Sequence, residues 1–132
     1  MGQAELDIVK RFTEALASQD METTMALMHP EIVFVETAGL PYEGEWKGPE
    51  GIGQLAQEIM GAYDYEVEGM THHDGGDRVF VQLRCKFTSR KSGASTVVPI
   101  VEVYEVQDGQ VIRNNIYYQD VPALVGLDEA AA

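Results

Sequence analysis

The chain has 132 residues, the length of one ordinary domain, and 45% hydrophobic against 23% charged residues, as in a globular protein. It carries 9 Lys and Arg against 22 Asp and Glu, which gives a net charge of −13. An anionic nucleic-acid backbone or an anionic membrane surface would be repelled by this charge, so neither is an expected partner.

No apolar run reaches the roughly 20 residues that span a bilayer, and the N-terminal stretch lacks the pattern of a secretory signal, so a cytoplasmic location is expected. The single Cys85 cannot form an internal disulfide. The three histidines do not combine with it at metal-binding spacing, so neither a metal nor another cofactor is expected.

Apolar residues recur at helical spacing near the start of the chain, which predicts an amphipathic helix over residues 3–18. Its apolar stripe consists of Leu6, Val9, Phe12 and Leu16. Asp20 can cap a second, short helix that carries Met25 and Met28, because its carboxylate can accept backbone N–H groups. Pro30 should end this helix, since the residue before a proline avoids the helical conformation.

Residues 31–36 have strand composition, and one face of the strand holds Ile32, Phe34 and Glu36. The next stretch, TAGLPYEGEWKG at residues 37–48, is rich in glycine and proline and long for a connection, as in lids and binding loops. A third helix is expected to start at Pro49 and to end at Gly61.

Beyond residue 61 the apolar period changes to two, which predicts strands over residues 63–73, 78–90, 95–107 and 111–119. The Asp108-Gly109 pair is a hairpin signal, and the four strands should form an antiparallel meander. The predicted architecture is α+β, with helices on one face of a curved antiparallel sheet that encloses a pocket. One domain should cover residues 1–127, followed by a disordered tail at 128–132.

The strand that contains TVVPIVEVYEV is apolar on both faces. Two-sided burial of an antiparallel strand requires a cover for its second face. A symmetric homodimer is the simplest cover, with Val101 and Val103 in the interface.

The element order and three stretches of sequence resemble the NTF2-like superfamily, in particular the SnoaL-like polyketide cyclases and the ketosteroid isomerases. The stretches are IVKRFTEALASQDMETTMALM, YEGEWKGPEGI and TVVPIVEVYEVQDGQVIRNNIYYQD. The resemblance implies a cone-shaped fold in which three helices and the sheet surround a pocket. Enzymes and binding modules share that fold, so the fold alone does not decide the function.

The resemblance implies two catalytic carboxyls. Glu36 matches the carboxylate that abstracts a proton in ketosteroid isomerases, and Glu102 matches the protonated carboxyl that donates a hydrogen bond to the developing enolate. Both glutamates share a strand face with apolar residues. If those faces point inward, desolvation and the neighbouring like charge should raise both pKa values. If they point outward, both are ordinary surface glutamates.

Six further residues are candidates for binding the substrate: Phe12, Tyr42, Trp46, Asn114, Tyr118 and Asp120. Phe12 takes the position of the family's oxyanion tyrosine. Asn114, Tyr118 and Asp120 share one strand face, although Tyr118 could be a half-buried core residue and Asp120 a helix cap. Tyr42 and Trp46 lie in the glycine-rich loop and could close over a substrate or pack the loop onto the body.

The leading hypothesis is a small cofactor-independent enzyme that catalyses proton transfer on an apolar, carbonyl-containing small molecule, as an isomerase or a cyclase does. Glu36 would be the base and Glu102 the hydrogen-bond donor. The alternative is a non-catalytic NTF2-like module that binds a small ligand or dimerises.

Overall fold

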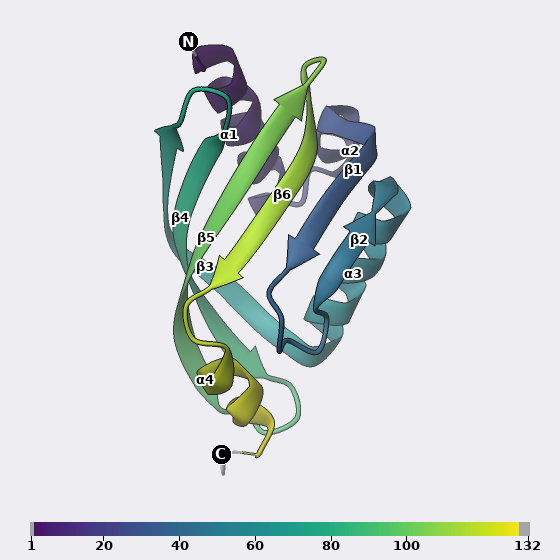
Figure 1. Ribbon diagram of the computed structural model, residues 1–132. Coiled ribbons are helices and arrows are strands. Elements are labelled where there is room, and N and C mark those ends of the chain that lie inside the picture. Colours follow the sequence, from purple (N-terminus) through teal and green to yellow (C-terminus); the bar gives the residue numbers. More distant parts are fainter. Residues whose placement is uncertain (1, 130–132) are drawn as a thin grey trace.

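A computed structural model describes residues 2–129 (Figure 1). Helices α1, α2 and α3 lie behind a single curved sheet, and α4 lies at its lower end in that view (Figure 1). The strand order is β2-β1-β6-β5-β4-β3. The elements are α1 Gln3–Ala17, α2 Met21–Leu27, β1 Met28–Glu36, β2 Gly44–Lys47, α3 Gly48–Ala62, β3 Tyr63–Asp74, β4 Val79–Ser89, β5 Ser95–Gln107, β6 Gln110–Tyr118, α4 Val121–Val125 and a 3-10 turn η1 Gly126–Glu129.

The first two helices form for the local reasons that the sequence indicates. Val9 and Phe12 are buried on the apolar stripe of α1. The Asp20 carboxylate accepts a hydrogen bond from the backbone N–H of Thr23 at 3.1 Å, which confirms the predicted cap of α2. Met28 was expected in the helix, but it is the first residue of β1, because its backbone pairs with Val111 of β6.

Of the two faces of β1, the one that holds Ile32, Phe34 and Glu36 is buried, which settles the direction that the sequence left open. The stretch 37–48 was expected to be irregular throughout. The structure instead has a short strand there, β2, which pairs antiparallel with β1. Strand β1 also runs parallel to β6, so the expected all-antiparallel sheet is wrong at this pair. Both differences arise from backbone pairing between segments far apart in sequence, which local composition does not encode.

Helix α3 begins one residue before the predicted start. Gly48 has φ +74°, a conformation that favours glycine, and Pro49 occupies the first turn, where its missing N–H costs nothing. Ile52 and Leu55 are buried and turn the helix toward β1.

The meander of β3 to β6 is confirmed, with antiparallel pairing throughout. Asp108 and Gly109 have φ values of 54° and 75° and connect paired residues Gln107 and Gln110, as in a two-residue type I′ turn. The register of this hairpin fixes Glu102 opposite Ile116.

Asp128 and Glu129 were expected in a disordered tail, but both are part of a regular element. Asp128 and Glu129 belong to η1, and Asp128 accepts a 2.6 Å hydrogen bond from the hydroxyl of Ser89. The remaining predicted tail residues, 130–132, lie outside the described part of the chain. Within residues 2–129, no helix has the length and apolar character needed to cross a membrane.

The core has an aromatic centre between α1 and the sheet. Phe12 of α1, Phe34 of β1 and Tyr104 of β5 contact one another edge to face, with ring centroids 6.0 to 6.5 Å apart. All three side chains are buried. This packing fixes α1 against the sheet and leaves Phe34 and Tyr104 on the wall of a cavity.

Candidate active site

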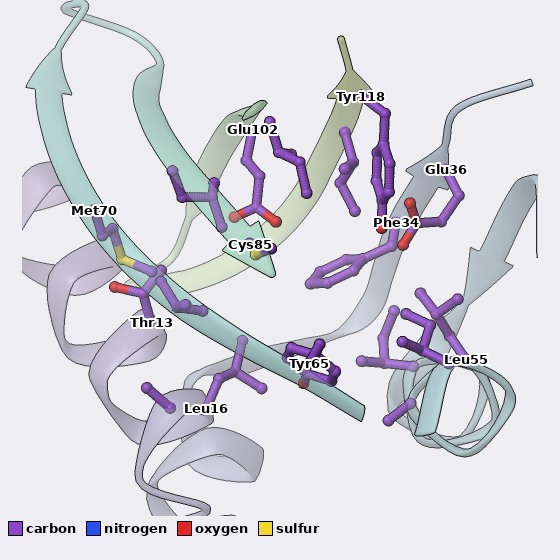
Figure 2. A pocket seen from close by; sticks show the side chains of 18 of the residues that line it. Thr13, Leu16, Phe34, Glu36, Leu55, Tyr65, Met70, Cys85, Glu102 and Tyr118 are labelled. Carbon is purple, nitrogen blue, oxygen red and sulfur yellow. The ribbon is translucent and has the colours of Figure 1, made fainter. Parts of the chain in front are cut away.

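A cavity of about 180 Å³ lies between the sheet and helices α1 and α3 (Figure 2). Its wall is mostly apolar, and five of its side chains are aromatic. Two carboxyls interrupt this apolar wall, Glu36 from β1 and Glu102 from β5. Among the described lining residues there is no Lys, Arg or His, so no side chain of the wall supplies a positive charge.

Glu36 is the last residue of β1, and its side chain is only 5% exposed. Its Oε1 atom has no hydrogen-bond partner among the described residues. Burial, and to a lesser extent the charge of Glu102, raise the pKa of the Glu36 carboxyl to about 8. The group is therefore mainly protonated at neutral pH and can donate a proton.

Glu102 lies on the inward face of β5, between the inward-pointing Ile100 and Tyr104. The Tyr104 hydroxyl donates a 2.9 Å hydrogen bond to Oε1 of Glu102. Burial raises the pKa of the Glu102 carboxyl, while Tyr104 and Asn114 oppose this shift because they stabilise the ionised form. Asn114 acts here as a nearby dipole, since neither amide atom reaches a hydrogen-bonding position.

The two carboxyls differ in the hydrogen bonds that stabilise their ionised forms. Glu102 accepts a phenol hydrogen bond, whereas Oε1 of Glu36 is unpartnered. Glu102 is therefore the better placed of the two to lose a proton, and its negative charge, once present, raises the pKa of Glu36. This difference in hydrogen bonding favours an ionised Glu102 beside a protonated Glu36, the combination that acid–base chemistry requires.

Tyr118, for which the sequence allowed a pocket or a core position, lines the cavity. Its hydroxyl also contacts the loop that precedes β2. Its hydroxyl and that of Tyr42 are 2.9 Å apart and share a hydrogen bond. The indole N–H of Trp46 in turn donates to the backbone oxygen of Tyr42 at 2.9 Å. Tyr42 and Trp46 thus hold the loop against the body from outside the cavity wall, and only Tyr118 of the three reaches the cavity.

The remaining three candidates also lie outside the cavity wall. Phe12 is fully buried in the core behind Phe34 and Tyr104. Asn114 is fully buried on β6, where it opposes the rise in the pKa of the Glu102 carboxyl. Asp120 is exposed, and its carboxylate accepts a 3.1 Å hydrogen bond from the N–H of Ala123, so it is the N-cap of α4.

Two residues of the site did not stand out in the sequence. Tyr104 was not considered, although its position two residues after Glu102 on one strand predicts that both share a face. Cys85 stands out in the sequence only as the single cysteine; it is buried and lines the cavity, and burial raises the pKa of its thiol to about 12. Within residues 2–129, no three His, Cys, Asp or Glu side chains are grouped to hold a metal ion.

The sheet, the three helices and the enclosed cavity define an NTF2-like fold, and solved structures share it. An NTF2-like protein of Burkholderia thailandensis E264 is 25% identical, with 95% of this chain and 96% of that chain covered and a TM-score of 0.84. TerC, co-crystallised with polyporic acid, is 20% identical over 97% of this chain and 100% of its own, with a TM-score of 0.85. A protein of Xanthomonas campestris pv. campestris described as a candidate polyketide cyclase is 18% identical over 96% and 97%, with a TM-score of 0.78.

The sequence also identifies a family within this fold. The model of the SnoaL-like domain matches residues 9–114, and the chain therefore belongs to the SnoaL-like family. A search of curated proteins found no match. The predicted resemblance to NTF2-like and SnoaL-like proteins is confirmed.

Proposed function

We propose that this protein is a small enzyme that catalyses proton transfer on an apolar, carbonyl-containing small molecule, as an isomerase or a cyclase. The observation that carries this proposal is the pair of unlike carboxyls in one apolar cavity. Burial raises the pKa of Glu36 to about 8, so this carboxyl is mainly protonated at neutral pH, and Glu102 accepts a hydrogen bond from the Tyr104 hydroxyl that stabilises its ionised form. An apolar wall of this kind accommodates a hydrophobic ligand, and the few polar groups orient it.

In this mechanism Glu102 abstracts a proton from the carbon next to the carbonyl, and Glu36 donates a hydrogen bond or a proton to the carbonyl oxygen. Negative charge collects on that oxygen in the transition state, where a correctly placed donor is most effective. The resemblance to ketosteroid isomerases gives the two roles in the opposite order. We favour Glu102 as the base because Tyr104 stabilises its ionised form and no such donor reaches Oε1 of Glu36.

Hydrogen exchange provides a test that requires no knowledge of the natural substrate. A panel of apolar ketones is incubated with the protein in D₂O, and the loss of the protons next to each carbonyl is followed by NMR. Glu102→Gln should lower the exchange rate by roughly 10²- to 10⁴-fold, the usual loss for a general base. Glu36→Gln should lower it less, because an amide still donates a hydrogen bond.

Glu31→Gln provides the matched control, since Glu31 lies on the same strand as Glu36 but is exposed to solvent. Its exchange rate should equal that of the wild type. If Glu36→Gln abolishes exchange while Glu102→Gln retains it, the roles are those that the resemblance implies. If neither substitution changes the rate, the carboxyl mechanism is wrong.

A second candidate function is binding without catalysis. The phenols of Tyr104 and Tyr118 are already engaged with Glu102 and Tyr42, and Phe12 carries no hydroxyl at the family's oxyanion position. TerC, which shares the fold, was crystallised with polyporic acid, which supports small-molecule binding in a cavity of this kind. A binding module would retain ligands from the panel without accelerating exchange.

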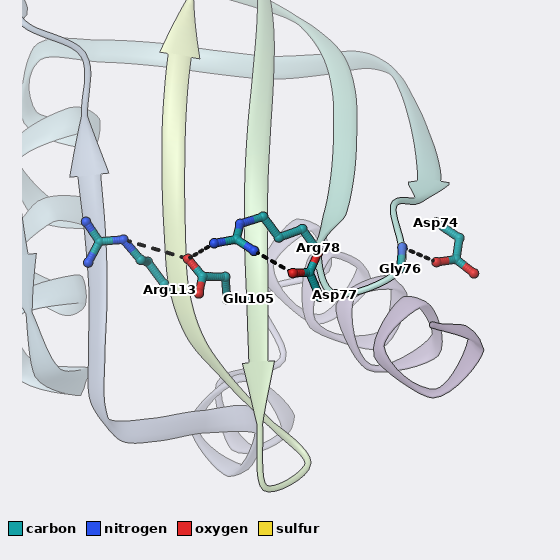
Figure 3. Close-up of polar contacts among 6 residues, drawn as sticks. All are labelled: Asp74, Gly76, Asp77, Arg78, Glu105 and Arg113. Atoms are coloured by element: carbon teal, nitrogen blue, oxygen red, sulfur yellow. Dashed lines mark hydrogen bonds and ion pairs between the residues drawn. The ribbon is translucent and has the colours of Figure 1, made fainter. Parts of the chain in front are cut away.

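We also propose that two copies of the chain pair through the outer face of the sheet. Val101 lies opposite Tyr117, and Val103 lies opposite Phe80, so the four form one continuous patch. Tyr117 is 56% and Phe80 37% exposed, which is unusual for large apolar side chains. Toward the β5–β6 turn the patch gives way to charged groups, where Glu105 lies between Arg78 and Arg113 (Figure 3).

A further inference from the structure

The rim of the cavity is apolar although it faces solvent. Leu16 of α1 is 41% exposed, and Tyr65 and Val67 of β3 are 50% and 37% exposed, yet all three also line the cavity. Figure 2 shows Leu16 and Tyr65 across the cavity from Glu102. If the carbonyl of a bound ligand lies beside the two carboxyls, the part of the ligand that extends out of the cavity therefore crosses an apolar rim.

A second hollow adjoins the cavity along α1 and β3. This hollow has a volume of about 300 Å³ and shares Thr13, Ala17, Val67 and Met70 with the cavity. A bulge in β3 between Val67 and Gly69 interrupts its register with β4 where the two hollows meet. A ligand that extends past the cavity over these shared residues would therefore reach a second hollow.

The second hollow carries negative charge. Glu14 and Glu68 line the second hollow, and His72 there hydrogen-bonds Thr13, with 2.9 Å between Nε2 and Oγ1. Burial lowers the pKa of His72, so it supplies little positive charge at neutral pH. Together with a net charge of −13, these carboxylates disfavour a ligand that ends in a carboxylate or a phosphate.

We infer that the ligand is an uncharged ketone with an apolar tail, whose carbonyl end occupies the cavity and whose tail crosses the rim formed by Leu16, Tyr65 and Val67. The ketone group in this inference rests on the proposed function, whereas the tail rests on the rim and on the second hollow. A cavity of about 150 Å³ holds benzene, so one ring fills the inner part and additional carbon atoms reach the rim.

Linear phenyl ketones test the tail. Acetophenone, butyrophenone and hexanophenone are titrated against the protein by calorimetry at pH 7. Affinity should rise about fourfold for each methylene that becomes buried, or about 0.8 kcal/mol. A carboxylate at the end of the hexanophenone chain should weaken binding about tenfold or more, through repulsion by Glu14 and Glu68.

Variants then locate the tail. Leu16→Asn should reduce the dependence of affinity on chain length, because it removes apolar surface from the rim. Met25→Asn is the matched control: Met25 is 49% exposed on α2 but lines neither hollow, so the dependence should stay as in the wild type.

The inference is wrong if affinity does not increase with chain length, if the terminal carboxylate binds equally well, or if no ketone binds up to its solubility limit. It is also wrong if the dependence persists in Leu16→Asn and in a second rim variant, Val67→Asn. Ketones that bind with the expected dependence but show no hydrogen exchange would refute the proposed catalysis and leave this inference intact.

Discussion

The raised pKa of Glu36 links the cavity to the stability of the whole fold. An increase from 4.5 to about 8 means that the folded state prefers the protonated over the ionised carboxyl by about 5 kcal/mol, at about 1.4 kcal/mol for each tenfold change. The stabilising effect of the buried, protonated group is fully present below pH 4.5. It is lost as the pH rises through about 8, because the folded state must then either keep a buried charge or unfold.

Glu36→Gln removes this titration and nearly preserves volume. Its free energy of unfolding, relative to the wild type, should therefore shift in favour of the variant as the pH rises. The relative gain should be about 1 kcal/mol at pH 5, about 3 kcal/mol at pH 7 and about 5 kcal/mol at pH 9. A constant cost of burying the amide adds to all three values and does not alter the trend.

Urea unfolding at these three pH values measures the trend, with the fluorescence of Trp46, the single tryptophan, as the signal. Glu31→Gln, at an exposed position of the same strand, should show a difference from the wild type that is nearly independent of pH. Acidic groups that do not interact with Glu36 titrate alike in the wild type and the variants, so their effects cancel. If the difference between wild type and Glu36→Gln is the same at pH 5 and pH 9, the Glu36 carboxyl is not desolvated as the structure indicates.

Three further outcomes are expected. Tyr104→Phe removes the hydroxyl that stabilises ionised Glu102 and should raise the pKa of that carboxyl further, as measured by NMR of the side-chain carboxyl carbons; an unchanged titration would contradict the proposed order of ionisation. Asp120→Ala removes the cap of α4 and should lower the free energy of unfolding by about 1 kcal/mol. Hydrogen exchange on ketones should not change, and a loss of exchange would show that Asp120 takes part in catalysis. Val101→Glu or Val103→Glu should shift a dimer toward monomer in sedimentation, and a wild type that is already monomeric at micromolar concentration would refute pairing through this face.

Local sequence was sufficient for features that depend on neighbours in the chain. The alternation of Ile32, Phe34 and Glu36 correctly placed the three on one face of the strand, because side chains of a strand alternate strictly between its two sides. The Asp108-Gly109 turn and the Asp20 cap were likewise predicted, since each depends on the conformation or hydrogen bonds of a few adjacent residues. These signals gave the element order and the meander, and with the family resemblance they gave the fold.

Tertiary structure decided the features that depend on contacts between segments far apart in the chain. Strand β2 exists because its backbone pairs with β1, and the glycine- and proline-rich stretch 37–48 that contains it gave no sign of a strand. Both faces of β5 are apolar, so only the packing of α1 and α3 determines that the face of Glu102 and Tyr104 encloses the cavity. The sequence allowed Asp120 to line a pocket or to cap a helix, and the structure shows it exposed and accepting a hydrogen bond from the N–H of Ala123. Sequence periodicity determines which residues share a face, but which face becomes covered depends on contacts between segments far apart in the chain, and these form only in the folded state.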